Sequence, residues 1–307
     1  MAVQIPEHCT LCPRRCGADR RRSKGRCGAG DTLLAARAAL HRWEEPCLSG
    51  TDPGRGSGTV FFCGCTLGCV YCQNGSISHG GEGRTITAER LTEIFLELQE
   101  QGAYNINLVT PTQYLPWILE ALTLVGERLT IPVLYNTGGY ERVETLRLLE
   151  GRVQIYLPDL KYYDSTLSAR YSAAADYFAV ASRAIPEMVR QVGPPRFDAQ
   201  GMLQSGVIVR HLVLPGSFRD SLRLIEWLAE EFDPQTIRVS LMSQYTPPPG
   251  ITLRELARPV FSYEYRKVCE RAAELGLLGY TQQRSSADAC FTPPFDGTGL
   301  CENLVQE

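Results

Sequence analysis

Three cysteines, Cys65, Cys69 and Cys72, share one short segment with the spacing C-x3-C-x2-C. Thiolates at this spacing on one tight loop hold three corners of a [4Fe–4S] cluster and leave the fourth iron open. An open coordination position is what a catalytic metal site needs. Gly64 and Gly68 allow the loop to fold closely around a cluster. A zinc site is the alternative, although zinc sites usually show paired C-x2-C knuckles and four ligands.

A second set of four cysteines lies in a short glycine-rich stretch near the N-terminus. Cys9, Cys12, Cys16 and Cys27 have the spacing C-x2-C-x3-C-x10-C. Four thiolates this close predict a closed structural site that holds zinc, which the small size favours, or a second iron–sulfur cluster. Free thiols are the alternative, because His8 is the one other metal-ligand type nearby.

The composition excludes several classes of protein. Of the 307 residues, 44% are hydrophobic and 21% are charged, as in ordinary globular chains and unlike disordered or collagen-like ones. No apolar run approaches the roughly 20 residues that cross a bilayer, and the first ten residues lack the apolar core of a secretory signal. Because 12 cysteines occur without an export signal, we expect mostly reduced thiols or metal ligands and a cytoplasmic location.

The net charge of −3 disfavours a broad phosphate-binding surface, so we expect no nucleic-acid partner. Six arginines do gather near the N-terminus without interleaved aromatic residues, and we interpret them as a solvated basic face. They are Arg14, Arg15, Arg20, Arg21, Arg22 and Arg26.

The elements that must position the cluster cysteines alternate regularly along the chain. Apolar, β-rich runs occur at residues 59–62, 105–109, 131–135, 153–157, 207–214 and 236–241. Helix-like stretches fall at residues 87–101, 113–126, 142–150, 174–191, 217–232 and 257–276. Strand–helix repeats of about 30–45 residues indicate parallel strands joined by crossover helices. We therefore predict an α/β fold built as a partial (β/α)6 barrel of the TIM type, with a doubly wound open sheet as the alternative.

This pattern divides the chain into three parts. Residues 1–50 are a small Cys-rich module with a connector, residues 51–280 are the partial barrel, and residues 281–307 are a tail. The tail is punctuated by glycine and proline, and we expect it to cap the mouth of the barrel. It carries Cys290, whose thiol the tail would then bring to the barrel mouth.

Polar side chains close or follow the predicted strands, where the sites of parallel barrels lie. Consecutive strand residues face opposite ways, so only one of Arg210 and His211 points into the barrel. His211 is either a cofactor contact or a hydrogen-bonded core residue, and Asp159 with Lys161 is either a site pair or a surface ion pair. The candidate binding residues are Asn107, Thr110, Asn136, Thr137, Asp159, Lys161, Arg210, His211 and Gln244.

The cysteine loop, placed at the mouth of the first strand of this pattern, resembles the loop of the radical S-adenosylmethionine (SAM) superfamily. Further segments are similar to the family of proteins that resemble pyruvate formate-lyase-activating enzyme, and the likeness spans nearly the whole chain. These segments are residues 9–17 (CTLCPRRCG), 43–47 (WEEPC), 58–62 (GTVFF), 105–111 (NINLVTP), 135–140 (YNTGGY), 155–162 (IYLPDLKY), 210–216 (RHLVLPG) and 242–245 (MSQY).

The resemblance implies a chemistry. SAM chelates the open iron through its amino and carboxylate groups, and one electron from the reduced cluster cleaves a C–S bond. The resulting 5′-deoxyadenosyl radical abstracts a hydrogen atom from a substrate, and a flavodoxin or ferredoxin is the implied electron donor. Residues matching Asn136, Thr137, Asp159 and Lys161 help to bind the SAM carboxylate, partly through a monovalent cation. The chain departs from the family at Gln244, where activating enzymes tend to carry a histidine.

Three functions compete. The first is direct hydrogen abstraction from a small molecule, sugar or peptide, as in an epimerase in which a thiol such as Cys290 returns the hydrogen. The second is activation of a glycyl-radical partner enzyme. The 28 arginines against three lysines suggest a GC-rich and commonly aerobic source, in which glycyl radicals would be destroyed by oxygen. The third, a non-catalytic metal-binding protein, is disfavoured because all three cluster cysteines occur together with Lys161.

Overall fold

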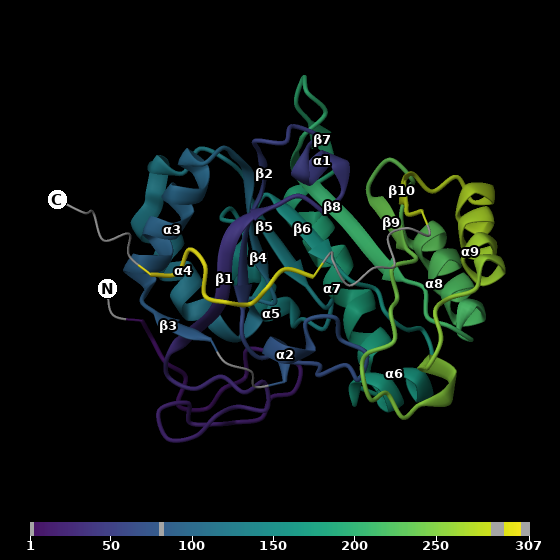
Figure 1. Cartoon of the computed structure of the whole chain (residues 1–307), viewed down its shortest axis with the longest axis horizontal. Coiled ribbons are helices and arrows are strands. Elements are labelled where there is room, and N and C mark those ends of the chain that lie inside the picture. Colours follow the sequence, from purple (N-terminus) through teal and green to yellow (C-terminus); the bar gives the residue numbers. More distant parts are fainter. Residues whose placement is uncertain (1–2, 80–82, 284–291, 302–307) are drawn as a thin grey trace.

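Parallel strands run through the centre of the molecule, as the alternation of strands and helices predicts, and the described residues form seven of them (Figure 1). The computed structural model describes residues 3–79, 83–283 and 292–301. Its ten-stranded sheet has the order β10-β9-β8-β6-β5-β4-β2-β1-β3, and β7 pairs with β8. The strands are β1 (Leu33–His41), β2 (Gly56–Phe62), β3 (Arg84–Ile86), β4 (Ala103–Val109), β5 (Val133–Thr137), β6 (Ile155–Pro158), β7 (Arg196–Phe197), β8 (Leu203–Leu212), β9 (Arg238–Met242) and β10 (Gly279–Thr281). The helices are α1 (Pro46–Ser49), α2 (Gly75–Ser78), α3 (Ala88–Glu100), α4 (Leu115–Val125), α5 (Val143–Leu146), α6 (Ser165–Ser172), α7 (Tyr177–Val192), α8 (Phe218–Glu231) and α9 (Ser262–Glu274).

The order of the parallel strands decides between the two predicted layouts. From β2 to β10 the parallel strands follow one another in the sheet in the same order as in the chain. A doubly wound sheet would instead reverse its strand order at a switch point. The sheet is therefore an incomplete TIM-type barrel, whose path through the described residues ends at β10 and at β3. β10 adds one short parallel strand to the six that the sequence predicts.

Helix α3 illustrates how the outer layer forms. The Thr87 side chain accepts a hydrogen bond from the backbone N–H of Arg90 and so caps the helix. Leu91, Ile94 and Phe95 recur at helical spacing and are buried. Each such side chain stabilises the fold by roughly 1.5–3 kcal/mol when it leaves water. The helix thus holds one face against α4 and the sheet, and it leaves the strand ends free for the site. Among the described helices, none is both long enough and apolar enough to cross a membrane.

Strand β1 is a regular element that was not predicted from the sequence, within the Cys-rich module and connector of residues 1–50. Its sequence is rich in alanine, which favours helix when taken alone. Pairing decides the outcome, because β1 runs antiparallel to β2 and to β3 and buries Leu33, Ala35 and Ala38. The predicted helix over residues 142–150 is likewise shorter, since α5 has four residues before a 3-10 turn at Arg147–Leu149.

The described part of the Cys-rich module contains only turns before β1, and two arginines fasten it to the barrel. Arg20 is 1% exposed, lies over the ring of Trp117, and donates to the carbonyl of Gln113 at 2.5 Å. Arg14 donates from Nε to the carbonyl of Thr66 at 2.9 Å. The expectation that all six N-terminal arginines form a solvated face is therefore wrong for these two. Their guanidiniums satisfy carbonyls that no regular secondary structure pairs.

The described part of the tail, residues 292–301, runs from the barrel mouth along β1 (Figure 1). The backbone N–H of Gly297 donates to Ala36, and that of Ala38 donates to Thr298. Phe295 packs edge-on against Phe61 of β2, with ring centroids 5.4 Å apart. The tail therefore lies against the same strands that border the cysteine loop.

Candidate functional site

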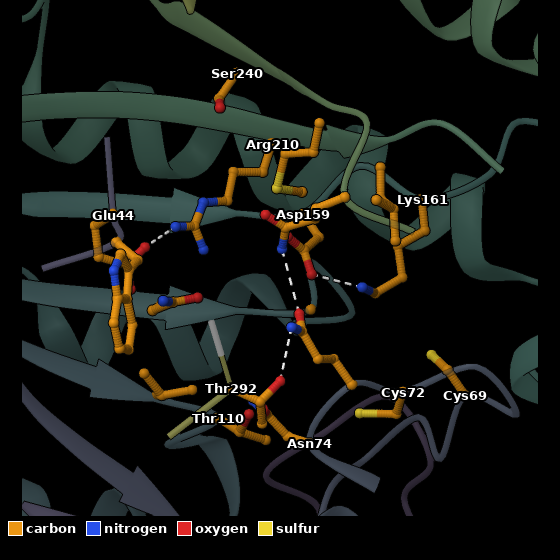
Figure 2. A pocket seen from close by; sticks show the side chains of 18 of the residues that line it. Glu44, Cys69, Cys72, Asn74, Thr110, Asp159, Lys161, Arg210, Ser240 and Thr292 are labelled. Atoms are coloured by element: carbon orange, nitrogen blue, oxygen red, sulfur yellow. Dashed lines mark hydrogen bonds and ion pairs between the residues drawn. The ribbon is translucent and has the colours of Figure 1, made fainter. Parts of the chain in front are cut away.

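A cavity of about 540 Å³ opens at the carboxyl ends of the parallel strands, and its lining residues include the three predicted cluster cysteines. Figure 2 shows Cys69 and Cys72 at one end, Glu44 and Arg210 at the other, and the Asp159–Lys161 pair between them. The volume lies in the range of enzyme ligand sites.

The cysteine loop follows β2 directly and turns at two glycines in the left-handed region, Gly64 (φ +78°) and Gly68 (φ +70°). The backbone N–H of Leu67 lies 3.4 Å from the Cys65 sulfur, and the Ser172 hydroxyl lies 2.9 Å from the Cys69 sulfur. Donors of this kind stabilise the thiolate form that binds iron.

The chemistry of these three thiols fits an iron–sulfur cluster. Burial, together with the neighbouring thiols of Cys69 and Cys72, raises the pKa of Cys65 to about 12, and a cationic iron bound to this sulfur would favour its thiolate. Within the described ranges, no three His, Cys, Asp or Glu side chains gather closely enough to hold a single metal ion. Cluster thiolates bind different irons and need not converge on one point.

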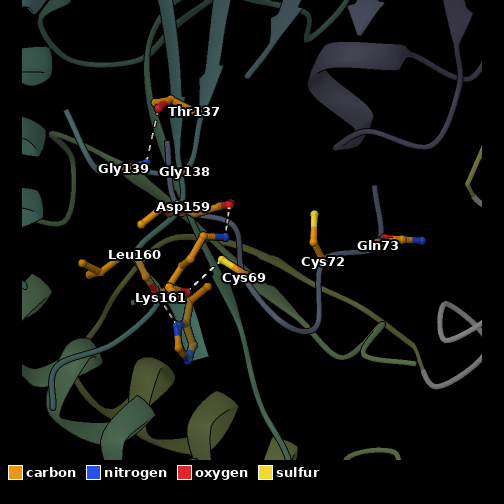
Figure 3. A network of polar contacts seen from close by, with 12 residues as sticks. Cys69, Cys72, Gln73, Thr137, Gly138, Gly139, Asp159, Leu160 and Lys161 are labelled. Carbon is orange, nitrogen blue, oxygen red and sulfur yellow. Dashed lines mark hydrogen bonds and ion pairs between the residues drawn. The ribbon is translucent and has the colours of Figure 1, made fainter. Parts of the chain in front are cut away.

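Lys161 and Asp159 meet beside the cluster loop, with Nζ 2.5 Å from Oδ2 (Figure 3). Burial alone would lower the pKa of Lys161, but Asp159, Cys69 and Tyr177 raise it above its usual value. The lysine therefore stays charged. Tyr177 fixes the turn, since its hydroxyl donates to the carbonyl of Asp159 at 2.7 Å and accepts from the N–H of Lys161 at 3.0 Å. Both side chains line the cavity, so they do not form the surface ion pair that was one of the two alternatives for them.

Arg210 lies at the opposite end of the cavity and holds two glutamates that precede α1. Its Nε donates to Glu45 Oε1 at 3.0 Å, and a terminal nitrogen donates to Glu45 Oε2 at 3.1 Å. The same nitrogen pairs with Glu44 (Figure 2). Burial lowers the pKa of Arg210 to about 10, which leaves the guanidinium charged at pH 7.

The remaining predicted residues divide between the cavity and the core. Thr110, Asn136, Thr137 and Gln244 line the cavity. Thr110 has a φ of +57°, a conformation that is rare for a β-branched residue and costs roughly 1–3 kcal/mol. Such strain is typical of functional sites.

Two predicted residues lie outside the cavity lining. Asn107 is buried on β4 and donates from Nδ2 to Glu44 Oε1 at 2.9 Å. His211 places Nδ1 2.7 Å from the Leu160 carbonyl and Nε2 2.8 Å from the Ser221 hydroxyl. His211 is therefore a hydrogen-bonded core residue, the second of its two alternatives. The pleat of β8 turns Arg210 toward the cavity and His211 away from it. Cys290 lies outside the described residues.

A chain of side-chain amides crosses the cavity mouth. Gln282 Nε2 donates to Gln244 Oε1 at 2.7 Å, Gln244 Nε2 to Gln73 Oε1 at 3.3 Å, and Gln73 Nε2 to the Thr292 hydroxyl at 2.8 Å. These bonds join the end of β10, the segment after β9, the cysteine loop and the tail. Gln244 thus contacts protein groups at the position where activating enzymes tend to carry a histidine.

The N-terminal cysteines lie next to the cysteine loop and outside the cavity lining. The carbonyl of Cys27 accepts a hydrogen bond from the backbone N–H of Cys65 at 3.1 Å. The pKa of Cys12 is raised by burial and by the nearby thiols of Cys27 and Cys9, and Cys16 lies close to Cys27. The fold therefore places the four cysteines that were predicted as ligands near one another.

A buried carboxyl group that was not predicted from the sequence lies behind the site. Glu141 is 2% exposed, and its Oε1 accepts hydrogen bonds from the hydroxyls of Thr112, at 2.6 Å, and Thr137. A glutamate two residues after a Gly-Gly turn gave no periodic signal. Glu44 and Glu45 were also assigned no role, although a doubled acid after Trp43 at the start of a short helix is an available signal.

Glu141→Gln is expected to change how stability depends on pH. Burial raises the pKa of Glu141 to about 7, against the lowering effect of the two threonine hydroxyls. A raised folded-state pKa gives stability that is present below the unfolded-state value of about 4.3 and is lost as pH rises through about 7. The glutamine has no such loss, so its stability relative to wild type should improve by about 2 kcal/mol between pH 5 and pH 8. Urea unfolding of both proteins at the two pH values measures this, and a constant difference would contradict it.

Comparison with known proteins agrees with this geometry. Residues 59–185 match the model of the radical SAM superfamily. Uncharacterized protein MJ0674 of Methanocaldococcus jannaschii is 28% identical over 257 residues, which cover 80% of this chain and 68% of that protein.

Two solved structures share the fold. SuiB of Streptococcus suis, bound to the precursor peptide SuiA, has a TM-score of 0.51 at 15% identity over 71% of this chain and 46% of its own. This chain therefore spans just under half the length of SuiB. A radical SAM methyltransferase from Sphaerobacter thermophilus also has a TM-score of 0.51 at 15% identity, over 76% of this chain and 67% of its own. The chain thus carries a radical SAM domain at residues 59–185, which confirms the resemblance noted from its cysteine loop and supports an enzymatic function.

Proposed function

We propose that this radical SAM enzyme removes a hydrogen atom directly from a small polar substrate bound in the cavity. The observation that supports this most is the layout of that cavity. Its lining includes the three thiols at one end and a buried charged group, Arg210 with Glu44 and Glu45, at the other. A substrate held by the charged end would be placed beside a cofactor held at the thiol end.

Each lining group has a proposed task. When bound, the [4Fe–4S] cluster and SAM supply hydrogen-atom abstraction from a C–H bond. Cys65, Cys69 and Cys72 hold the cluster. Asn136, Thr137 and the Asp159–Lys161 pair would hold the SAM carboxylate, partly through a monovalent cation. Thr292 and the amide chain restrict water at the mouth. A reduced flavodoxin or ferredoxin is the proposed electron donor.

Activation of a glycyl-radical enzyme is the alternative. A glycine substrate has no side chain, so it would leave the charged end of the cavity without a ligand. The tail contacts at the mouth, from Thr292 to Gln73, would also have to open for a loop of a second protein. Both points favour a small substrate over a protein one.

The test begins with anaerobically reconstituted full-length protein. Reduction in the presence of SAM should release 5′-deoxyadenosine, and the rate should rise when the low-molecular-mass fraction of an extract of the source organism is added. No release from protein with a full cluster would refute the enzymatic function. Stimulation by the macromolecular fraction alone would favour the activase.

If the reaction inverts a carbon centre, a hydrogen atom must be returned from the face opposite the abstraction. We infer that Cys290 is the thiol that would do so in an epimerase. The support for this is its place in the chain, because Thr292 and Pro293, two and three residues later, line the cavity.

We also propose that Cys9, Cys12, Cys16 and Cys27 bind zinc or a second iron–sulfur cluster that supports folding. A single zinc ion would require these four side chains to lie closer together than they do in the described structure. Metal binding at such a module is coupled to its folding. Replacing Cys12, which is buried, with alanine should lower metal content by one zinc or by one cluster per chain and lower the melting temperature. Unchanged iron and zinc contents in folded Cys12→Ala protein would show that the second site does not exist.

A further inference from the structure

The charged end of the cavity has an unusual composition. Glu44 and Glu45 have side chains 7% and 6% exposed, and both share the single guanidinium of Arg210, which is 14% exposed. A hydrogen bond from Ser240 also reaches Glu45. Two carboxylates and one guanidinium leave one negative charge in excess.

The other acidic and basic side chains that line the cavity, Asp159, Lys161 and His41, do not offset this excess. Asp159 and Lys161 neutralise each other at 2.5 Å. Burial and the guanidiniums of Arg210 and Arg37 lower the pKa of His41 to about 4, so its imidazole is neutral at pH 7. The excess charge therefore stays with Glu44, Glu45 and Arg210.

A buried charge without a counter-ion is costly. Burial raises the pKa of Glu45, so this carboxyl takes up a proton more readily than an exposed one as long as no counter-ion lies beside it. Asn107 adds an independent observation next to Glu44. It is fully buried, its Nδ2 donates to Glu44, and its Oδ1 has no partner among the described residues. The cavity end thus lacks a positive charge beside Glu44, and the Oδ1 of Asn107, behind the cavity lining, lacks a donor. A cationic N–H group bound at Glu44 supplies the charge.

We propose that Glu44, with Glu45 and Arg210, binds a primary ammonium group of the substrate, so that the enzyme acts on a small polar amine. This inference rests on the proposed function, because it takes the cavity to be the substrate site. Arg210 holds the two carboxylates in place, and Glu44 supplies the negative charge that the ammonium neutralises. Trp43 lines the same end and is half exposed, and an aromatic ring there also favours a cation over an anion.

The test compares two probes that differ in one group, 5-aminopentan-1-ol and pentane-1,5-diol, by ligand-observed NMR titration of the reconstituted protein with SAM. The amine should bind at least tenfold more tightly than the diol. Glu44→Gln should remove that preference and leave the weak affinity for the diol unchanged. Glu127→Gln is the matched control, since Glu127 is exposed and outside the cavity lining, and it should behave as wild type.

Equal affinities for the two probes, including the case in which neither binds, would overturn the inference, and so would a Glu44→Gln protein that keeps the preference. The comparison of probes on wild-type protein needs no variant, so a misfolded Glu44→Gln protein would not leave the question open. Release of 5′-deoxyadenosine is measured separately. Amine preference without release would refute the radical function alone, and release without amine preference would refute the amine site alone.

Discussion

Cys69→Ala is expected to lower 5′-deoxyadenosine release at least a hundredfold, whereas Cys63→Ala, six residues earlier, is expected to retain it. Cys69 lines the cavity beside Lys161 and is one of three thiols available to the cluster. Two thiolates leave a cluster with two unprotected irons, which a [4Fe–4S] unit does not tolerate as a stable catalytic form. Iron content and visible absorbance after reconstitution report the cluster, and chromatography of the reaction reports the release.

Cys63 is a matched control because it is buried in the same segment and does not line the cavity. It packs with Ala36, Phe61 and Ile77, so its truncation removes a small apolar contact and costs about 1 kcal/mol. Wild-type release from Cys69→Ala would refute the cluster assignment. Equal loss in both variants would mean that the assay reports folding of the loop and not cluster binding.

The parts of the fold that follow from local patterns could be predicted from the sequence. The parallel strands from β2 to β9 are short apolar runs between amphipathic helices, and their polar ends met at one cavity because parallel strands share one carboxyl edge. The cysteine loop carried its chemistry in its spacing alone. None of these features needs a partner that is distant in the chain.

The parts that depend on distant partners could not be predicted. β1 is an alanine-rich segment that becomes a strand only beside β2 and β3. Arg210 lies 166 residues from Glu44, so no pattern in either segment predicts that the two residues pair. The choice between Arg210 and His211 required the pleat register of β8, which adjacent residues in a sequence leave ambiguous by one position.

The burial of Arg20 and the contact of Arg14 with the cysteine loop could not be predicted from the sequence for a related reason. An arginine-rich stretch without regular structure looks solvated, because nothing in it shows which carbonyls elsewhere need a donor. The carbonyl of Gln113 and the carbonyl of Thr66 become acceptors only after the barrel and the cysteine loop have formed. The module and the loop are thus mutually dependent parts of the structure.

That dependence gives the second large prediction: Gly64→Ala should prevent cluster assembly, whereas Gly68→Ala should permit it. Both glycines have left-handed φ angles, +78° and +70°, in which an alanine costs roughly 1–2 kcal/mol. Their surroundings differ. A Cβ at Gly64 would lie 2.2 Å from the carbonyl oxygen of Cys27, whereas nothing lies within 4 Å of a Cβ at Gly68.

The clash at Gly64 involves backbone and has no flexible side chain to relieve it. The carbonyl of Cys27 is also the acceptor for the N–H of Cys65, so moving it away breaks the bond that aligns a cluster ligand. Gly64→Ala should therefore reconstitute with less than a tenth of the iron of the cysteine loop and lose release in proportion. Gly68→Ala should lose only the stability that its φ costs, measured by urea unfolding. If the two variants bind iron equally, the contact between the N-terminal module and the cysteine loop has no part in holding the cluster, and the module must be regarded as an independent unit.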